Sequence, residues 1–316
     1  MNLDFFTVLI NIGILLLLGL PGYIFRKNKM LEGRDSKPLV ILLIYITQSF
    51  LIIMSFQDKE YEPSILASIG WVALFSFLAH LLILAIAWLV FGFEKDRKAR
   101  GVYTFASAFA NCGYMGLPVI SALFYGSPIL PELRIYVSFY IAVFNIVNWT
   151  IGIYIISGDR KYISLKNALL NPTTIALAVA LPLFFLKVKI ADYSPQLARA
   201  FSMLGDMTTP LSMIILGIKL AEMPFLQVFS SWKVYLVSLL KLFAMPFLLM
   251  ALMIPASHLM GDVARYAVLI VAAMPVATLT IANTERFGGD SLAAAKCLLC
   301  STLLSALTIP LICQLL

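Results

Sequence analysis

Long apolar runs, separated by short breaks of charged and turn-forming residues, dominate the sequence. A helix needs about 20 apolar residues to cross the hydrocarbon core of a bilayer, and these runs have about that length. Of the 316 residues, 61% are apolar and only 12% are charged, too few for a soluble domain to cover its surface. The pattern predicts an all-α polytopic membrane protein whose ten transmembrane helices lie at about residues 4–25, 38–56, 65–93, 101–125, 135–157, 168–186, 197–221, 232–255, 265–287 and 292–316.

Basic residues predict the orientation because lysine and arginine favour the cytoplasmic side of a membrane. The first, third and fifth breaks carry most of them: Arg26, Lys27, Lys29, Arg34, Lys37, Lys95, Arg97, Lys98, Arg100, Arg160, Lys161 and Lys166. We therefore expect a multi-pass protein of the cell membrane with both termini outside. The net charge of +7 then reflects topology rather than a nucleic-acid partner. The sixth break, with Lys187, Lys189 and Arg199, opposes the alternation.

An offset of 161 residues relates the two halves of the chain: it aligns Trp71 with Trp232 and places His80 opposite Lys241. Each half holds five predicted spans, an odd number, so two equivalent halves must lie in the membrane in opposite orientations. The sequence thus predicts two inverted five-helix repeats. Their predicted bounds are residues 1–157 and 158–316.

Spans 4 and 9 are interrupted near their middle. In span 4, Gly113 relaxes the backbone and Pro118 removes the partner of the Tyr114 carbonyl. Pro275 interrupts span 9, and the Thr278 hydroxyl follows it. Unpaired backbone groups cannot face lipid, so the two breaks are either packed proline kinks or the wall of a wet site.

Half-helix N-termini at such a site suit an anion. Two asparagines of span 5, Asn145 and Asn148, lie three residues apart, so we expect them to share a helix face and to reach the crossing or bond between helices. The predicted substrate-binding residues are Asn111, Gly113, Tyr114, Pro118, Asn145, Asn148, Pro275, Val276, Ala277 and Thr278.

Three segments carry a resemblance to a known family. The run from Asn111 to Pro118 resembles the N-x-G-(F/Y)-(M/L)-G-x-P signature of the auxin efflux carrier family. Residues 205–217 resemble its G-x-x-T-x-P-L-x-x-x-x-x-G segment, and residues 301–310 its C-terminal T-L-L-S-x-x-T-x-P ending. Bacterial members of that family include malate and malonate permeases, and its plant members are the PIN carriers.

The resemblance implies ten helices in two inverted repeats, with broken helices 4 and 9 crossing as in folds of the sodium/proton antiporter or bile-acid symporter type. It also implies an elevator in which helices 3–5 and 8–10 move against a scaffold of helices 1, 2, 6 and 7, with the protein a homodimer. This chain lacks the long central loop of the PIN carriers, so the resemblance gives no support to auxin as substrate.

Four ionisable side chains are expected within spans: Asp206, Lys241, Lys296 and His80. An intramembrane carboxylate is a functional candidate, and Asp206 could bind a proton or sodium ion or pair with either lysine. The structural alternatives are a static ion pair, lysines that reach the interface, and a hydrogen-bonded core histidine.

These features favour a secondary transporter of a small organic anion, a carboxylate, in a lipid bilayer. A cation/proton antiporter, a sodium-coupled symporter of the same fold and an anion channel remain alternatives. The sequence has no H-E-x-x-H motif, no nucleotide-binding loop and only one acid deep in a span, so we expect neither an enzyme nor a cofactor other than a coupling proton or sodium ion. Four cysteines in apolar runs are expected to pack rather than to bind metal.

Overall fold

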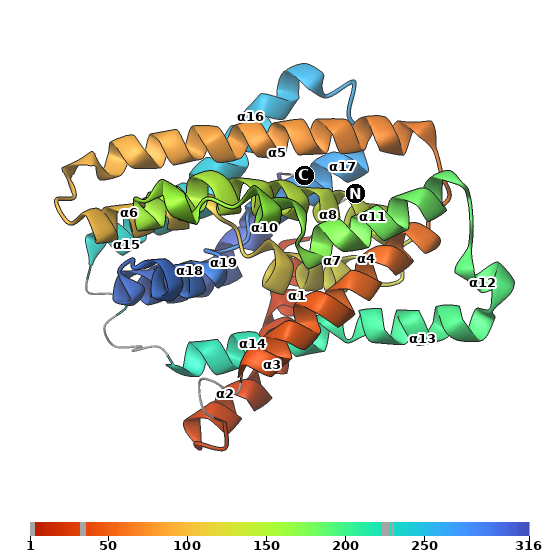
Figure 1. Ribbon diagram of the computed structural model, residues 1–316, viewed down its shortest axis with the longest axis horizontal. Coiled ribbons are helices and arrows are strands. Elements are labelled where there is room, and N and C mark those ends of the chain that lie inside the picture. The colour runs from red at the N-terminus through yellow and green to blue at the C-terminus, as the bar shows by residue number, and fades with distance from the viewer. Residues whose placement is uncertain (1–3, 32–35, 223–227, 229–230, 316) are drawn as a thin grey trace.

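The computed structural model describes residues 4–31, 36–222, 228 and 231–315; Arg34 of the first break lies outside them. Within this part the chain is helical except for its connections and one isolated backbone bridge (Figure 1). Seven segments are long and apolar enough to cross a membrane, which confirms the predicted all-α polytopic class. They are Phe5–Lys27, Ser36–Gln57, Pro63–Phe93, Leu130–Ser157, Pro195–Glu222, Trp232–Ala256 and Ser291–Cys313.

The other three expected spans contain shorter or interrupted helices. Cys112–Leu123 and Pro172–Phe185 are apolar but short, and span 9 is divided into two helices by an extended segment. The count of ten crossings therefore stays a prediction. The elements are α1 (Phe5–Leu18), α2 (Leu20–Lys27), α3 (Ser36–Ile41), η2 (Leu42–Thr47), α4 (Gln48–Gln57), α5 (Pro63–Val90), η3 (Phe91–Phe93), α6 (Arg97–Ala108), η4 (Cys112–Gly116), α7 (Leu117–Leu123), α8 (Leu130–Val147), η5 (Asn148–Gly152), α9 (Ile153–Ser157), η6 (Arg160–Tyr162), α10 (Leu165–Leu169), α11 (Pro172–Phe185), α12 (Ile190–Tyr193), α13 (Pro195–Asp206), α14 (Thr208–Glu222), α15 (Trp232–Leu239), η8 (Leu240–Ala244), α16 (Met245–Met253), η9 (Ile254–Ala256), α17 (Asp262–Ala272), α18 (Leu279–Phe287) and α19 (Ser291–Cys313).

Helices α2 and α14 pack backbone to backbone because glycines face the contact. A Cβ on Gly22 would lie 2.1 Å from the Ile214 carbonyl oxygen, and one on Gly217 would lie 1.9 Å from the Gly19 carbonyl oxygen. Small residues allow membrane helices to approach closely where lipid supplies no hydrophobic driving force between them. The sequence thus fixes the contact between spans 1 and 7.

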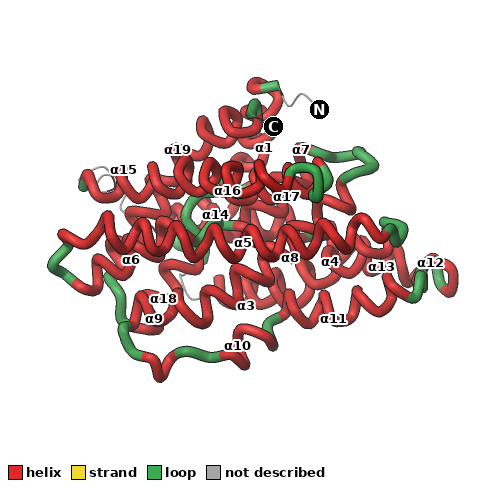
Figure 2. Tube along the Cα trace, turned by 90° about the horizontal axis from the view of Figure 1, so that it is seen from above, coloured by secondary structure: helices red, strands yellow, loops and turns green. Residues whose placement is uncertain are grey.

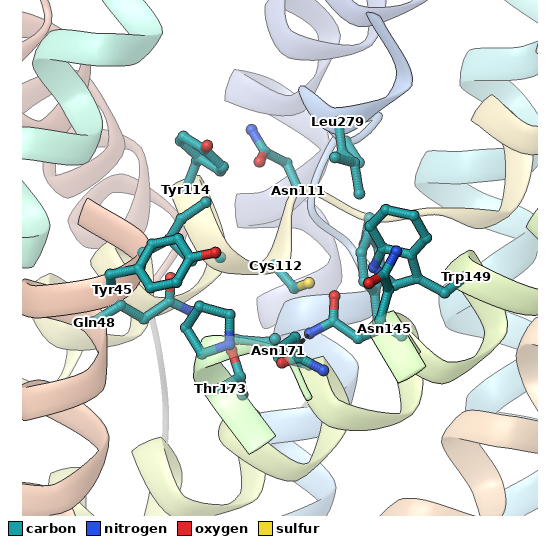
Figure 3. Close-up of a pocket in the computed structure, with 18 of the residues that line it drawn as sticks. Tyr45, Gln48, Asn111, Cys112, Tyr114, Asn145, Trp149, Asn171, Thr173 and Leu279 are labelled. Carbon is teal, nitrogen blue, oxygen red and sulfur yellow. Dashed lines mark hydrogen bonds between the residues drawn. The ribbon is translucent and has the colours of Figure 1, made fainter. Parts of the chain in front are cut away.

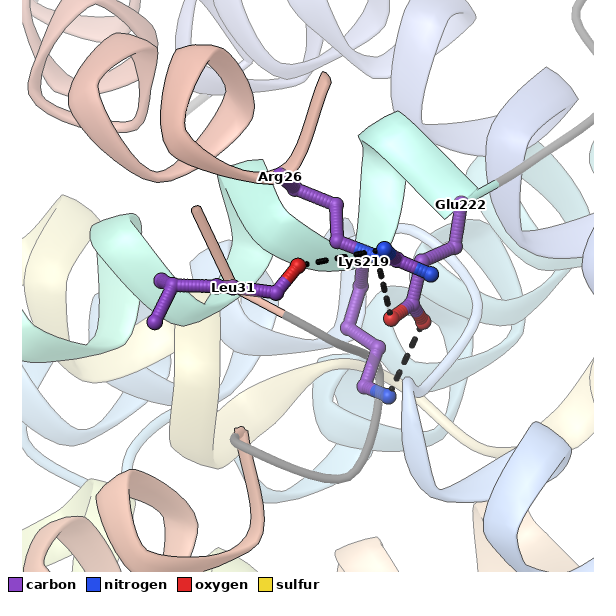
Figure 4. A network of polar contacts seen from close by, with 4 residues as sticks. All are labelled: Arg26, Leu31, Lys219 and Glu222. Atoms are coloured by element: carbon purple, nitrogen blue, oxygen red, sulfur yellow. Dashed lines mark hydrogen bonds and ion pairs between the residues drawn. The ribbon is translucent and has the colours of Figure 1, made fainter. Parts of the chain in front are cut away.

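Ion pairs close the same contact at its end (Figure 4). Arg26 of α2 lies 3.2 Å from the Glu222 carboxylate of α14 and donates to the Leu31 carbonyl at 3.1 Å. Lys219 lies 3.2 Å from the same carboxylate. Arg26 thus ties α2 to the last turn of α14, and Lys219 binds the same carboxylate from within α14.

The long helix α5 runs alongside α6 and α8 (Figure 2). In Figure 1, α5 and the α13–α14 pair lie near opposite edges of the molecule, and the broken helices lie between them. Helices α4, α8 and α11 contact one another. This arrangement places both breaks in the interior.

Lys189 explains part of the irregular charge pattern in the sixth break. Its ammonium donates to the carbonyl oxygens of Gln57 and, at 2.9 Å, of Lys59. These carbonyls lie at or just beyond the C-terminus of α4, where helical acceptors lack intrahelical donors. The charge of Lys189 therefore caps a helix end, so it is a weak guide to orientation.

Candidate functional site

The two interrupted helices cross and exchange backbone hydrogen bonds. Helix α6 ends at Ala108 and is followed by extended chain, and α17 ends at Ala272 and is followed by a turn that leads to Pro275. The Asn111 N–H donates to the Pro275 carbonyl at 2.8 Å, and the Ala277 N–H donates to the Phe109 carbonyl at 2.9 Å. This antiparallel bridge satisfies groups that the breaks would otherwise leave unpaired.

Side chains from two further helices complete the crossing. The Val276 N–H donates to the Ser301 hydroxyl of α19 at 3.0 Å. The fully buried Lys241 ammonium donates to the Ala272 carbonyl at 2.6 Å, at the C-terminus of α17. A cation there interacts favourably with the negative end of the helix dipole. Side chains of η8 and α19 thus hold the crossing.

A cavity of about 380 Å³ lies beside the crossing. In Figure 3, Tyr45 and Gln48 stand on one side, Asn145 and Trp149 on the opposite side, and Cys112 between them. The described residues that line the cavity come from spans 2, 4, 5 and 9, from α10 and from the start of α11: Ile44, Tyr45, Gln48, Ala110, Asn111, Cys112, Gly113, Tyr114, Ile141, Phe144, Asn145, Trp149, Asn167, Leu170, Asn171, Pro172, Thr173, Ala277, Leu279 and Arg286.

The lining combines mainly apolar surface with several amide groups, and it carries a single charge among its described residues. Four asparagines and one glutamine contribute amides, and no carboxylate is among the lining residues. Arg286, in the last turn of α18, is exposed and lies over the rings of Trp149 and Phe287, with its Cζ 5.9 and 5.3 Å from their centroids. A concave site with one cation and no acid favours an anionic ligand.

Asparagines connect the cavity walls. Asn145 of α8 donates to the Asn171 side-chain oxygen at 3.2 Å, and Asn171 caps α11 by accepting from the Thr174 N–H. The Asn111 amide nitrogen is buried and has no hydrogen-bond acceptor among the described residues. It is therefore an unused donor in the cavity wall.

The structure divides the ten predicted binding residues into two groups. Asn111, Gly113, Tyr114, Asn145 and Ala277 line the cavity. The rest lie behind it: Pro118, Asn148, Pro275, Val276 and Thr278. Within that second group, Pro275 and Val276 build the crossing through their backbone groups.

Asn145 and Asn148 meet different partners. The helix is continuous between them, and the Asn148 N–H bonds to the Phe144 and Asn145 carbonyls. Asn145 faces Asn171, whereas the buried Asn148 oxygen accepts from the Asn283 amide of α18 at 2.8 Å. Asn148 thus bonds between helices, to α18, instead of lining the cavity.

The four ionisable candidates are spread through the fold. His80 is buried in α5, with Nδ1 2.6 Å from the Ser76 carbonyl oxygen and its ring against Phe109 of the crossing. Lys241 bonds to Ala272 as described, and Lys296 lies half-buried in the second turn of α19. No ion pair joins Asp206 to Lys241 in the part of the chain that the structure describes.

Asp206 is the last residue of α13 and is exposed at the junction with α14. Its charge acts on Asp58, which follows α4, and on Arg134 of α8. Burial raises the pKa of Asp58 above its ordinary value of 3.8, although Arg134 and Lys189 attract the carboxylate and oppose that rise. Asp206 therefore belongs to a charged region away from the cavity.

Sequence reasoning missed the cavity residues supplied by other spans, notably Tyr45, Gln48, Asn171, Thr173 and Arg286. Asn171-Pro172 is a helix-start signal, and it marks the beginning of a helix inside the membrane region. Arg286 lies at the end of predicted span 9, where membrane topology alone accounts for a basic residue. A Cβ on Gly113 would lie 3.6 Å from the Gln48 amide nitrogen, so span 2 contacts the broken helix directly.

Comparison with known proteins agrees with this geometry. None of the curated proteins compared with the chain matches it. The model of a family described as membrane transport protein, which is the auxin efflux carrier family, matches residues 7–313. That family consists of membrane transporters rather than enzymes. The match covers almost the whole sequence, so the chain belongs to the auxin efflux carrier family of membrane transport proteins.

Proposed function

We propose that the chain is a secondary transporter of a small organic anion, a carboxylate, bound in the cavity beside the crossing of helices 4 and 9. The observation that carries this proposal is the lining: amides and one arginine, with no acid among the described lining residues. The amide N–H groups of Asn111 and Asn145 and the Arg286 guanidinium are suited to bind carboxylate oxygens.

The proposal includes alternating access by an elevator motion between two inverted repeats, residues 1–157 and 158–316. The cavity lies between the proposed scaffold, represented by Tyr45, Gln48 and α11, and the proposed transport helices with the crossing. Its rim includes Asn167 and Arg286 from the fifth and ninth breaks. If these breaks are cytoplasmic, as the charge pattern predicts, both termini lie outside the cell membrane and the cavity opens inward. The homodimer implied by the resemblance belongs to the same proposal.

Uptake of labelled malate and malonate into liposomes that contain the purified protein tests the proposal. Arg286→Gln removes a charge-assisted hydrogen bond of about 1.5–3 kcal/mol, so uptake at limiting substrate should fall by about tenfold or more. Arg286→Lys should retain part of it. Arg160→Gln is the matched control, because Arg160 also lies over an aromatic ring, Tyr154, but does not line the cavity.

Asn111→Ala should lower uptake as well, because it removes the unused donor. Uptake equal to the unmodified protein in both Arg286→Gln and Asn111→Ala would refute the site. A cation/proton antiporter needs acids near the crossing; sodium-dependent quenching of a pH dye inside the liposomes would favour that function instead. Currents above carrier turnover would favour an anion channel.

A further inference from the structure

We propose that a charged layer at the far end of the cavity helices, formed by Asp58, Lys59, Glu132, Arg134 and Asp206, is the gate that keeps the second face of the transporter closed. This inference rests on the elevator motion proposed above, because it assigns the layer to the boundary between scaffold and transport helices. The layer comprises two groups: the direct ion pair of Lys59 with Glu132, and Arg134, whose charge interacts with those of Asp58 and Asp206.

The layer lies away from the cavity along three helices. On α4, Gln48 lines the cavity and Asp58 follows the C-terminus, about 15 Å further at 1.5 Å per residue. On α8, Glu132 and Asn145 are separated by about 20 Å in the same way. Helix α11 begins at the cavity and ends beside Lys189, which caps α4. The cavity and the charged layer thus occupy opposite ends of one three-helix contact.

The ion pair directly joins the loop that follows scaffold helix α4 to the transport helix α8. The Lys59 ammonium lies 2.9 Å from the Glu132 carboxylate, and their side chains are only 21% and 15% exposed. Burial opposes the charge of Lys59, but hydrogen bonds and attraction to Glu132 and Glu62 outweigh it and raise the pKa of Lys59. Sliding α8 along α4 must break this pair. Breaking a half-buried pair costs more than breaking a solvated one.

Arg134 forms the second group. It belongs to α8 and donates to the Ser121 hydroxyl of α7 at 3.1 Å, so it is fixed to the transport helices. Its two acidic neighbours, Asp58 and Asp206, belong to the scaffold helices 2 and 7. Attraction across this boundary opposes the same sliding motion. The offset of 161 residues that relates the repeats also places Asp206 at the position of Tyr45 in the cavity, as expected for the corresponding lining on the second face.

Aromatic rings pack against one another beneath the layer. Phe56 of α4 packs against Phe139 of α8 and Phe184 of α11, with ring centroids 6.5 and 5.2 Å apart, and the Tyr61 ring lies 5.4 Å from that of Phe184. Phe56, Tyr61 and Phe184 also line a cavity of about 340 Å³. The contact between Phe56 and Phe139 crosses the proposed boundary, where apolar rings oppose passage of a hydrated anion as hydrophobic constrictions do in channels.

The test measures opening of the second face without any substrate. In a background with the four native cysteines replaced by alanine, Phe139→Cys places a thiol beneath the layer. Its reaction with a membrane-impermeant thiol reagent then reports how often the second face opens. Glu132→Ala in that background should raise the reaction rate about threefold to tenfold, because it removes the pair across the boundary. The exchanged variant, Lys59→Glu with Glu132→Lys, should return the rate toward the background.

Glu62→Ala is the matched control. Glu62 lies 3.3 Å from the same lysine, but it is three residues away on the same loop and 55% exposed, so it holds nothing across the boundary. Equal rates for Glu132→Ala and Glu62→Ala, or an exchanged variant as fast as Glu132→Ala, would overturn the gate. Because no anion is used, this outcome is independent of malate or malonate uptake: an intact gate without uptake would refute the substrate instead.

Discussion

Ser301 provides the sharpest test of how the crossing is built. Its hydroxyl accepts a hydrogen bond from the Val276 N–H at 3.0 Å and donates to the Leu298 carbonyl at 3.0 Å. Ser305, one turn later on α19, donates to the Thr302 carbonyl at 2.7 Å. Both serines are fully buried, and they differ in that Ser301 also accepts from the interrupted span.

Ser301→Ala and Ser305→Ala therefore remove the same atoms from the same helix, with different consequences. In both variants the helix loses a local bond to a carbonyl. Only Ser301→Ala leaves the buried Val276 N–H without an acceptor, and an unsatisfied buried donor costs about 1–3 kcal/mol. We expect Ser301→Ala to lower the free energy of unfolding by about that much more than Ser305→Ala.

Denaturant unfolding in mixed micelles measures this difference in free energy. Malate uptake in liposomes shows whether loss of the hydrogen bond between Ser301 and Val276 also impairs the cavity. Uptake should fall in Ser301→Ala, because the Val276 segment bonds to the Asn111 segment that lines the cavity. Equal unfolding free energies, within about 0.5 kcal/mol, would refute the reasoning that Ser301 fixes the crossing.

Three further predictions concern other parts of the fold. Gly22→Ala should lower the unfolding temperature in detergent, because its Cβ would overlap a backbone carbonyl of α14, whereas Gly13→Ala, with nothing within 4 Å, should not lower it. A double-mutant cycle of Asn148→Ala and Asn283→Ala should give a coupling of about 1 kcal/mol in unfolding experiments, and additive effects would exclude their bond. Because burial raises the pKa of Asp58, its ionisation lowers stability as pH rises above 3.8. Melting curves between about pH 4 and pH 7 should therefore show Asp58→Asn gaining stability relative to the unmodified protein, and a constant difference would contradict this sign.

The sequence locates the break of span 9 directly and that of span 4 only approximately. Pro275, which lacks an N–H group, lies in the break of span 9. In span 4 the chain leaves the helix at residues 109–111, and Gly113 and Pro118 lie in the helical run Cys112–Leu123 that follows. Since unpaired backbone groups must be buried or wetted, two such breaks in one membrane domain predict an interior site. In the structure, Ala110 in the break of span 4 lies directly opposite Val276 in the break of span 9.

The rest of the cavity depends on packing that the sequence pattern does not encode. Tyr45 and Gln48 lie in an apolar span whose rotation about its axis is set by its neighbours, and a π-helical turn, η2, immediately precedes Gln48. Asn145 and Asn148 are three residues apart on one helical stretch, yet Asn145 faces Asn171 and Asn148 faces Asn283. The partner that each amide meets follows from tertiary contacts rather than from residue spacing.

Arg286 shows why a basic residue that binds a substrate is hard to distinguish, in the sequence, from one that sets the orientation in the membrane. The positive-inside rule and anion binding both favour a basic residue at the end of span 9 that the charge pattern predicts to be cytoplasmic, so its position alone cannot separate the two roles. What separates them is its place among the cavity residues beside Trp149. Under the proposed cycle, a carrier must bind its anion firmly enough to capture it and weakly enough to release it on the other face. Neutral amides deep in the cavity and one solvent-exposed guanidinium at its rim meet both requirements, because a buried ammonium or a second arginine would hold the anion where the protein must let it go.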